Sequence, residues 1–218
     1  MSEIQPPVQG PVSATRATER ARGLARYAAD LILPGTVLVG VARSPHAHAR
    51  VISIDTKPAL EIPGVLAVLT PADFDGIELG HPDTDEPVLT RVARYVGEAV
   101  VAVAASDQDS LLRGIEALHI DYQVLPHACS VADALTLDQP LHAAYPDNVV
   151  RRFNAKRGDW QAAEQRVSTW VSGTFQTQAV PHAYLEPRAT LVRVNGELLE
   201  LVTGSHFPSV LAETYREI

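Results

Sequence analysis

The chain has 218 residues, 46% hydrophobic and 20% charged, a composition typical of a globular rather than a disordered protein. Its formal net charge of −8 and pI near 5.4 give no reason to expect a polyanionic partner, so nucleic acid is disfavoured. No run of about 18 apolar residues occurs, so no membrane span is expected. The single Cys129 excludes an internal disulfide and a cysteine-ligated iron–sulfur cluster within this chain. Because the first residues also lack the basic and apolar regions of a secretion signal, we predict a cytoplasmic protein.

The first half of the chain indicates alternating strands and short helices. An extended tail is predicted over residues 1–20, and the basic stretch that follows is either a solvated segment or an interface clamp. A loop is predicted over residues 75–90, and Ser106 is the expected N-cap of an amphipathic helix. Apolar and β-branched runs predict strands at residues 36–42, 50–54, 64–69, 97–105 and 119–124. The last two strands and the helix between them would make a right-handed crossover if the strands pair in parallel.

The second half indicates longer strands after a short helix at residues 131–135 and a loop at 138–148. The dipeptide Asn195-Gly196 is a strong hairpin signal between two of these strands. Two further helices are predicted, one starting at Gly158-Asp159 and one over residues 208–218. Strands are predicted at residues 149–156, 167–177, 188–194 and 198–203.

Motifs for familiar chemistries are absent or weak. The chain has no GxGxxG, Walker or GxSxG motif, so nucleotide binding and serine hydrolysis have no support. His46 and His48 could bind a metal from one strand face, but no third ligand is indicated and both adjoin a turn. His142 and His182 stand alone and are interpreted as structural.

Glu186 lies in a segment whose side chains could take part in chemistry, between Tyr184 and a proline. Packed with His182 and Tyr184, its carboxyl could be a buried acid with a raised pKa. Alternatively Glu186 pairs with Arg188 and only orients a loop. The residues alone favour the structural interpretation.

A series of strings in one order resembles the molybdopterin-binding large subunit of the xanthine dehydrogenase and aldehyde oxidase family. Each string is weak alone, but together they span the chain from residue 23 to residue 218. They are GLARYAAD at residues 23–30, RSPHAHAR at 43–50, PGVLAV at 63–68, RYVGE at 94–98, DY at 121–122, LP at 125–126 and LEP at 185–187, with His182 before the last.

The resemblance implies an α+β fold in which an α/β hammerhead domain covers residues 21–130. A linker at 131–147 would lead to a partial, strand-rich molybdopterin-binding domain at 148–218. The family implies an oxidoreductase that hydroxylates an aromatic heterocycle or aldehyde with oxygen from water. It also implies a molybdenum–molybdopterin cofactor and partner chains: the rest of the molybdopterin-binding subunit, a [2Fe–2S] subunit and an FAD subunit.

One departure lies near the expected cofactor site. The family usually has Ser/Thr-Thr-Gln where this chain has Gly204, Ser205 and His206, followed by Phe207, and we predict that these four residues approach the cofactor. An imidazole still donates one hydrogen bond, but its reach and charge differ from those of glutamine. Ala99, where the family often has proline, is a milder change.

The family's other cofactor and catalytic elements are expected beyond this chain. Its glycine-rich loop should follow shortly after Ile218, and its catalytic glutamate much later. We therefore expect no catalytic residue or metal ligand here, with Glu186 and His182 near the substrate or structural. The chain would be part of a hydroxylase that is inactive alone, or, alternatively, a non-catalytic binding or assembly module with the hammerhead fold.

Overall fold

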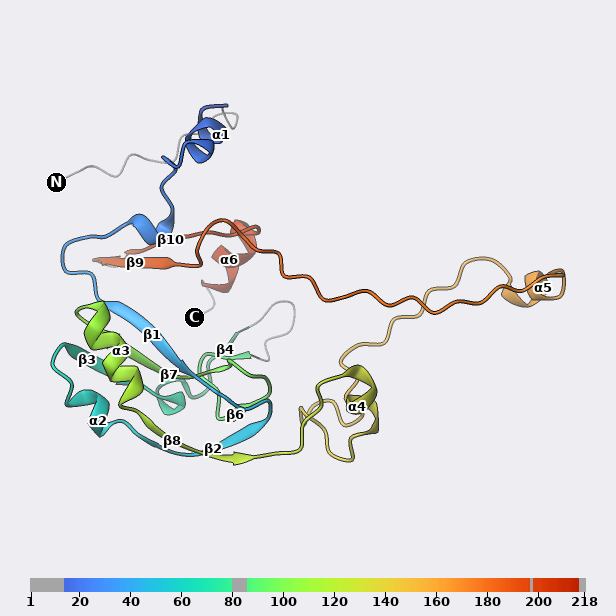
Figure 1. The fold of residues 1–218 in the computed structure, drawn as a ribbon, viewed down its shortest axis with the longest axis horizontal. Helices are drawn as coiled ribbons and strands as arrows, with labels where there is room; N and C mark the ends of the chain where they lie inside the picture. The colour runs from blue at the N-terminus through green and yellow to red at the C-terminus, as the bar shows by residue number, and fades with distance from the viewer. Residues whose placement is uncertain (1–13, 80–85, 197, 216–218) are drawn as a thin grey trace. The chain divides into compact units, whose positions relative to one another are not determined.

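A computed structural model describes residues 14–79, 86–196 and 198–215. The chain divides into two units, which are treated separately (Figure 1). The sheet unit comprises Gly35–Gln178 and Thr214–Ile218, and the hairpin unit comprises Met1–Pro34 and Ala179–Glu213. Short helices lie beside antiparallel sheets in this chain, which agrees with the predicted α+β class.

Strand β7 (Ala99–Ala105) is the centre of the sheet unit. It pairs antiparallel with β1 (Leu38–Arg43) on one side and β3 (Val65–Leu69) on the other. Val100, Val101 and Val103 are fully buried because β7 is covered on both faces. The apolar strand predicted at residues 97–105 is therefore confirmed, and it forms the core of the sheet unit.

Helix α3 (Gln108–Glu116) packs against this sheet through Leu111, which contacts the cluster of Val103 and Ala105. Gly114 lets the helix lie close to β3, because a Cβ at this position would be only 2.7 Å from Val65 Cγ2 and would not fit. The helix N-cap is Asp107 rather than the predicted Ser106. The Asp107 carboxylate accepts a hydrogen bond from the backbone N–H of Ser110 at 2.8 Å.

The capping carboxylate makes the stability of α3 depend on pH. The backbone N–H of Ser110, then the hydroxyls of Ser110 and Ser106, hold the pKa of Asp107 below its ordinary value of 3.8. A carboxyl with a lowered folded-state pKa stabilises the fold above its ordinary pKa, and this is lost as pH falls through the folded-state value.

Asp107→Ala should therefore lower stability by a constant amount from about pH 7 to about pH 5, and by less at more acidic pH. Urea unfolding of both proteins across this range measures the difference. Asp109→Ala removes a carboxylate from the same turn without removing the cap, and serves as the control. A difference that persists unchanged down to acid unfolding would contradict the role of the charge.

A second sheet has the order β6-β2-β8, formed by β6 (Val92–Ala93), β2 (Ala49–Asp55) and β8 (His119–Val124). Its strands are also antiparallel, and β8 has the bounds that the sequence predicts. The crossover interpretation is wrong, because β7 and β8 lie in different sheets and do not pair. Val51, Ile54, Ile120 and Tyr122 of this second sheet pack against the core of the first.

A tight connection joins helix α2 (Lys57–Leu60) to β3 through Gly64. Its φ of +92° is one that residues with a Cβ rarely adopt. The Gly64 carbonyl accepts the backbone N–H of Ser106 at 2.8 Å, and the Ser110 hydroxyl donates to the Pro63 carbonyl at 2.9 Å. These contacts fasten the start of β3 to the start of α3.

The loop predicted over residues 75–90 carries two short strands, β4 (Glu78–Leu79) and β5 (Glu86–Pro87), which pair. Residues 80–85 of that loop lie outside the described residues. Residues Pro71–Phe74 before this loop form a 3-10 turn, η2, capped by the Thr70 hydroxyl, which accepts a hydrogen bond from the Ala72 backbone N–H. Among the described residues, no helix combines the length and apolarity that crossing a bilayer requires.

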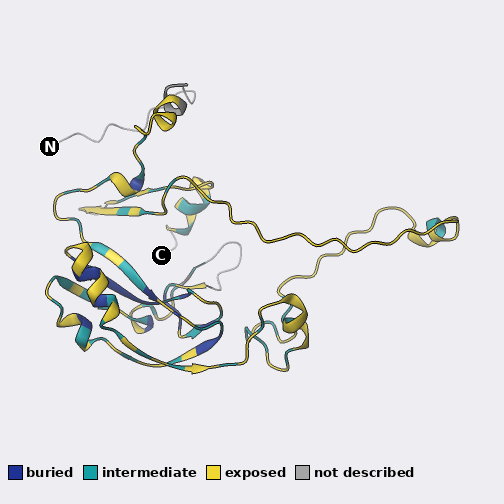
Figure 2. Cartoon of the chain, in the orientation of Figure 1, coloured by how far each residue is buried: buried dark blue, intermediate teal, exposed yellow. Residues whose placement is uncertain are grey.

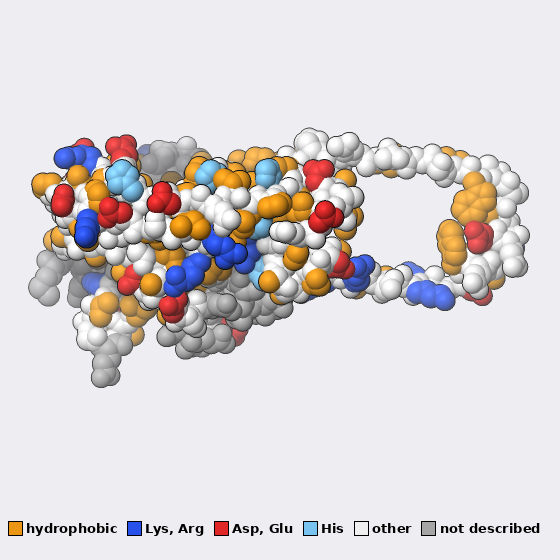
Figure 3. Space-filling view, turned by 90° about the horizontal axis from the view of Figure 1, so that it is seen from below, with side chains coloured by type: hydrophobic (Ala, Val, Ile, Leu, Met, Phe, Trp, Pro, Cys, Tyr) orange, Lys and Arg blue, Asp and Glu red, His pale blue; other side chains and the backbone are white. Residues whose placement is uncertain are grey.

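The remainder of the sheet unit contains helices α4 (Val131–Thr136) and α5 (Trp160–Glu164), both close to prediction. The strands predicted at 149–156 and 167–177 are wrong: both ranges are described, and neither forms a strand. A strand needs a hydrogen-bonding neighbour, and the described residues offer these segments none. This part of the chain is coloured mostly as exposed in Figure 2, and hydrophobic side chains lie on its surface in Figure 3. Val171 is 92% exposed and Phe175 is 95% exposed.

The hairpin unit is built on β9 (Thr190–Asn195) and β10 (Leu198–Thr203). They pair antiparallel around Asn195-Gly196, where Gly196 has a φ of +63°, so the predicted hairpin is confirmed. The 3-10 turn η1 (Ala28–Asp30) lies against β9. The unit also contains helices α1 (Ala14–Ala21) and α6 (Pro208–Thr214). Residues 14–20 of the predicted extended tail are thus helical, and residues 1–13 lie outside the described residues.

Candidate functional site

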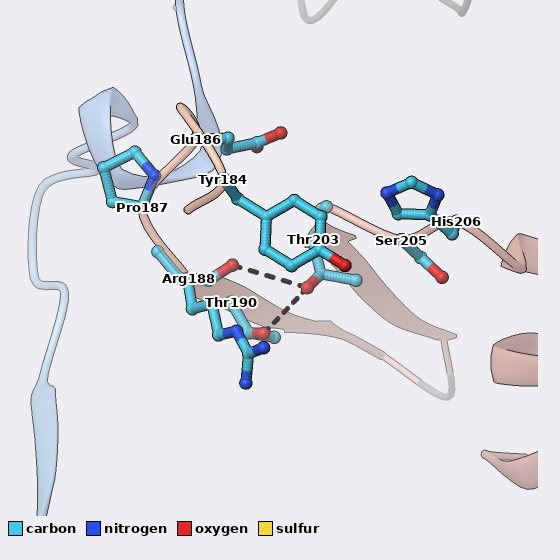
Figure 4. Close-up of a pocket in the computed structure, with 10 residues that line it drawn as sticks. Tyr184, Glu186, Pro187, Arg188, Thr190, Thr203, Ser205 and His206 are labelled. Carbon is cyan, nitrogen blue, oxygen red and sulfur yellow. Dashed lines mark hydrogen bonds between the residues drawn. The ribbon is translucent and has the colours of Figure 1, made fainter. Parts of the chain in front are cut away.

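A cavity of about 620 Å³ opens at one end of the β9–β10 hairpin (Figure 4). Tyr184 and residues 186–190, which lead into β9, form one part of its lining. Residues 203–206, which follow β10, form the other. The hairpin reverses the direction of the chain, so the segment before β9 and the segment after β10 face one another across this cavity.

Two threonines join the strands at the base of the cavity. The Thr190 and Thr203 hydroxyl oxygens are 2.9 Å apart, and the Thr203 hydroxyl also donates to the Ala189 carbonyl at 3.4 Å. Thr190 and Thr203 are directly opposite in the hairpin register. This cross-strand pair holds the two lining segments at a set separation.

Tyr184 is the centre of an aromatic cluster beside the cavity. Its ring lies parallel to that of His182, with 5.6 Å between centroids, and is tilted by 56° from that of His206 at 5.5 Å. The Arg188 guanidinium carbon lies 6.0 Å from the Tyr184 ring centroid, at the limit of a cation–π contact.

Glu186 and Gly204 meet closely across the cavity. A Cβ built on Gly204 would lie 3.0 Å from the Glu186 carboxyl carbon, so the carboxylate occupies space that most side chains at position 204 would need. Glu186 is only half-buried. The predicted ion pair with Arg188 is not formed; within the described residues, Arg188 lies over Tyr184 instead.

The predicted cofactor residues divide into two groups. Gly204, Ser205 and His206 line the cavity, whereas Phe207 is 71% exposed and does not. His182 also stays outside the lining, and its ring stacks on that of Tyr184.

His46 and His48 lie in a bend before β2 rather than on a strand face. His48 is buried, and its Nδ1 is 2.6 Å from the Pro126 carbonyl oxygen, while the His46 ring meets Tyr122 edge-on at 5.1 Å. Burial raises the pKa of the Tyr122 hydroxyl. The Ser44 hydroxyl hydrogen-bonds both the backbone N–H and the carbonyl of His46, which confirms the turn interpretation.

No group of three His, Cys, Asp or Glu residues that could hold a metal occurs in the part of the chain that the structure describes.

Sequence reasoning did not identify Arg188 as a lining residue, nor the threonine pair. A signal for both was present in the hairpin dipeptide, because the hairpin register places Thr190 opposite Thr203. Continuing this register beyond the pair would have brought residues 187–189 opposite 204–206.

The fold and the site together define a hammerhead-type α/β region followed by the beginning of a cofactor-binding region. Residues 22–126 match the family described as aldehyde oxidase and xanthine dehydrogenase, a/b hammerhead domain. Residues 141–218 match the molybdopterin cofactor-binding domain. The chain belongs to the xanthine dehydrogenase and aldehyde oxidase family and corresponds to the N-terminal part of its molybdopterin-binding large subunit. The predicted family and α+β fold are therefore confirmed.

Curated relatives and a solved structure agree with this assignment. The nicotinate dehydrogenase large molybdopterin subunit of Eubacterium barkeri is 33% identical over 87% of this chain and 45% of its own length. The xanthine dehydrogenase molybdenum-binding subunit of Escherichia coli O157:H7 is 27% identical over 89% of this chain and 28% of its own. Quinoline 2-oxidoreductase from Pseudomonas putida 86 matches 90% of this chain and 27% of its own, with a TM-score of 0.81 and 29% identity. The chain thus spans less than half the length of each.

Proposed function

We propose that this chain contributes the hammerhead domain and the start of the molybdopterin-binding domain to a molybdenum hydroxylase. The match of both domains in order, with a polar cavity lined by residues 204–206, carries the proposal. The domain bounds proposed from the sequence are 21–130 for the hammerhead domain, 131–147 for the linker and 148–218 for the second domain. The matched regions, 22–126 and 141–218, support two domains in this order, and the second match begins within the proposed linker.

The cavity fits one side of a molybdenum–molybdopterin cofactor. The Ser205 hydroxyl and His206 imidazole can donate hydrogen bonds into the cavity, while the missing side chain of Gly204 leaves room for the Glu186 carboxylate. We assign cofactor contact to these three residues, with Phe207 at the rim. When bound, the cofactor supplies the metal centre at which a substrate carbon is oxidised with oxygen from water. Glu186 faces the same cavity from the opposite segment, as a substrate-side or structural residue.

The proposed substrates are aromatic heterocycles or aldehydes, and the proposed electron path runs to [2Fe–2S] and FAD groups on partner chains. The remaining molybdopterin-binding region is a further partner. The relatives' names support this arrangement, because they describe a large molybdopterin subunit and a molybdenum-binding subunit. We place the assembly in the cytoplasm.

Purification of the native complex through a tag on this chain tests the proposal. We expect molybdenum in stoichiometric amount by elemental analysis, together with polypeptides that carry iron–sulfur and flavin absorbance. The chain expressed alone is the control and should retain no molybdenum. Recovery of partner polypeptides without molybdenum would instead support the non-catalytic assembly module, and molybdenum held by the chain alone would contradict the shared cofactor site.

A further inference from the structure

The end of β9 carries a dipeptide, Asn195-Gly196, whose chemistry is separate from that of the cavity. Asn195 is the last residue of β9, and Gly196 follows it with a φ of +63°. Both residues are exposed, and nothing lies within 4 Å of a Cβ built on Gly196. The side-chain amide of Asn195 is therefore followed by a backbone nitrogen whose residue has no side chain and lies in open space.

The chain has three asparagines, and their surroundings differ. The Asn148 amide is held in place, because its Oδ1 accepts the Leu141 backbone N–H at 2.7 Å and its Nδ2 donates to the Ala134 carbonyl at 2.8 Å. Asn154 is exposed and precedes an alanine. Asn195 is exposed, precedes a glycine, and has no hydrogen bond to its side-chain amide from any described residue.

An exposed asparagine before glycine can lose its side-chain amide without a catalyst. The Gly196 backbone nitrogen gives up its proton and bonds to Cγ of Asn195, while the bond from Cγ to the side-chain nitrogen breaks and ammonia leaves. Glycine favours this ring closure, because it has no Cβ to crowd the attack and its backbone rotates freely. The product is a cyclic succinimide.

Water then opens the succinimide at one of its two carbonyl carbons. Breaking the bond between the Gly196 nitrogen and Cγ leaves aspartate. Breaking the bond between this nitrogen and the backbone carbonyl carbon of Asn195 leaves isoaspartate, in which the main chain runs through Cβ and Cγ. Water is the co-reactant, ammonia is the leaving group, and nothing is oxidised or reduced.

Ring closure requires the end of the hairpin to open. Asn195 is extended and pairs with Leu198, and in an extended residue the next backbone nitrogen is rotated away from the side chain. Opening costs little here, because two strands alone are at best marginally stable in water. Val194, Leu198 and Leu199 beside the turn are 74%, 60% and 55% exposed, and Figure 2 colours much of the hairpin as exposed.

We propose that Asn195 is a site of spontaneous deamidation, and that its isoaspartate product uncouples β9 from β10. Isoaspartate adds one carbon atom to the backbone at the turn, and the turn sets the register of a hairpin. The Thr190–Thr203 pair at the other end of the strands then loses its alignment, and with it the separation of the segments that line the cavity. This modification goes beyond the proposed function and requires neither molybdenum nor a partner chain.

Ageing of the purified full chain in mildly alkaline buffer tests the chemical step. Peptide mass mapping follows the replacement of the amide NH₂ by OH at each asparagine, and enzymatic methylation detects isoaspartate. We expect Asn195 to react at least about tenfold faster than Asn154, because the alanine after Asn154 crowds the attack and restricts the backbone. Equal rates at Asn195 and Asn154 would overturn the proposal.

The same measurement in urea tests whether the hairpin opens readily. We expect the rate at Asn195 in the folded chain to be within about tenfold of the rate in the unfolded chain, because a marginal hairpin is open for a sizeable fraction of the time. Protection of Asn195 by about a hundredfold or more in the folded chain would contradict the proposed opening.

Gly196→Ala keeps the asparagine and should slow its deamidation at least about tenfold. Alanine at a φ of +63° also strains the turn and favours opening, so a slower reaction is not explained by a tighter hairpin. Gly158→Ala is the matched control, since Gly158 has a φ of +79° and open space around a Cβ but lies outside the hairpin. An unchanged rate in Gly196→Ala would refute the attack by the Gly196 nitrogen.

Asn195→Asp separates the effect of the new charge from that of the longer backbone. This variant should keep the cross-strand NMR contacts between Thr190 and Thr203, whereas the isoaspartate form isolated from the aged chain should lose them. Contacts that persist in the isoaspartate form, or that disappear equally in Asn195→Asp, would overturn the proposed uncoupling. Molybdenum content plays no part in these measurements, so their failure is distinguishable from a failure of the proposed function.

Discussion

Gly64→Ala is expected to destabilise the sheet unit by about 4 kcal/mol, the sum of two independent costs. A φ of +92° is strained for any residue with a Cβ, which costs about 1–3 kcal/mol. The new methyl group would also lie 2.8 Å from Ser110 Cβ and 3.0 Å from Ser106 Oγ, and overpacking of this kind costs about 1–3 kcal/mol.

The neighbours of Gly64 have little freedom to move away. The Ser110 hydroxyl, with one hydrogen to donate, lies within hydrogen-bonding distance of both the Pro63 carbonyl at 2.9 Å and the Asp107 carboxylate at 2.8 Å. Shifting Ser110 would therefore disturb the N-cap of α3 as well as the turn before β3. Because the structure cannot relax around the new methyl group, the backbone strain and the overpacking are expected to add.

Gly76→Ala separates these two costs. Gly76 has a similar φ of +83°, but nothing lies within 4 Å of a Cβ built there. This control should lose only the conformational part, about 1–2 kcal/mol. Urea or thermal unfolding of the two variants and the wild type gives the comparison. If both variants lose the same free energy of unfolding, overpacking at Gly64 makes no contribution.

The double substitution Val171→Asp and Phe175→Asp is expected to abolish assembly with the rest of the proposed enzyme. Alternate residues of an extended chain share a face, so Val171 and Phe175 lie on one side of the segment at 167–177. Their exposures of 92% and 95% are unusual for apolar side chains and indicate a surface that a partner covers. Two charges buried at such an interface should weaken it by at least about a hundredfold.

The isolated chain should tolerate the same double substitution. Exposed side chains without contacts change stability by about 0.5 kcal/mol or less. Binding of a hydrophobic dye by the chain alone should fall, because the apolar surface is removed. Ser172→Asp with Gln176→Asp places equal charge on the other face and is the matched control. Co-purification with partner chains is the readout, and assembly that survives the Val171 and Phe175 changes would contradict the interface.

The sequence predicted many of the local elements well, because their signals lie within the elements. β8 and β10 have the predicted bounds, and the apolar run at 97–105 became the core strand. The N-cap of α3 was misplaced by one residue because Ser106 and Asp107 are both good capping residues. Which of the two acts as the N-cap depends on which side chain reaches the backbone N–H of Ser110.

Non-local features were harder to predict. The alternation at 167–177 describes a chain suited to a strand, but a strand forms only beside a partner. The crossover interpretation failed for a related reason, since helix and strand periodicity do not say which sheet a strand joins. In the cavity, Gly204, Ser205 and His206 were predicted from the family resemblance, and Glu186 was a candidate from the residues around it. The hairpin signal could have placed Arg188 in the lining, but its position over Tyr184 depends on side-chain packing, which no local pattern encodes.

The contact between η1 and β9 has a consequence for the order of events during synthesis. About 160 residues separate these segments, so at about 5–20 residues per second the ribosome makes η1 roughly 8–30 s before β9 exists. The strands and helix of the sheet unit lie within the intervening stretch and can fold in that interval, since closing short loops takes far less than a second. During this interval η1 lies on the nascent chain without its contact to β9, which forms only after the hairpin has left the ribosome.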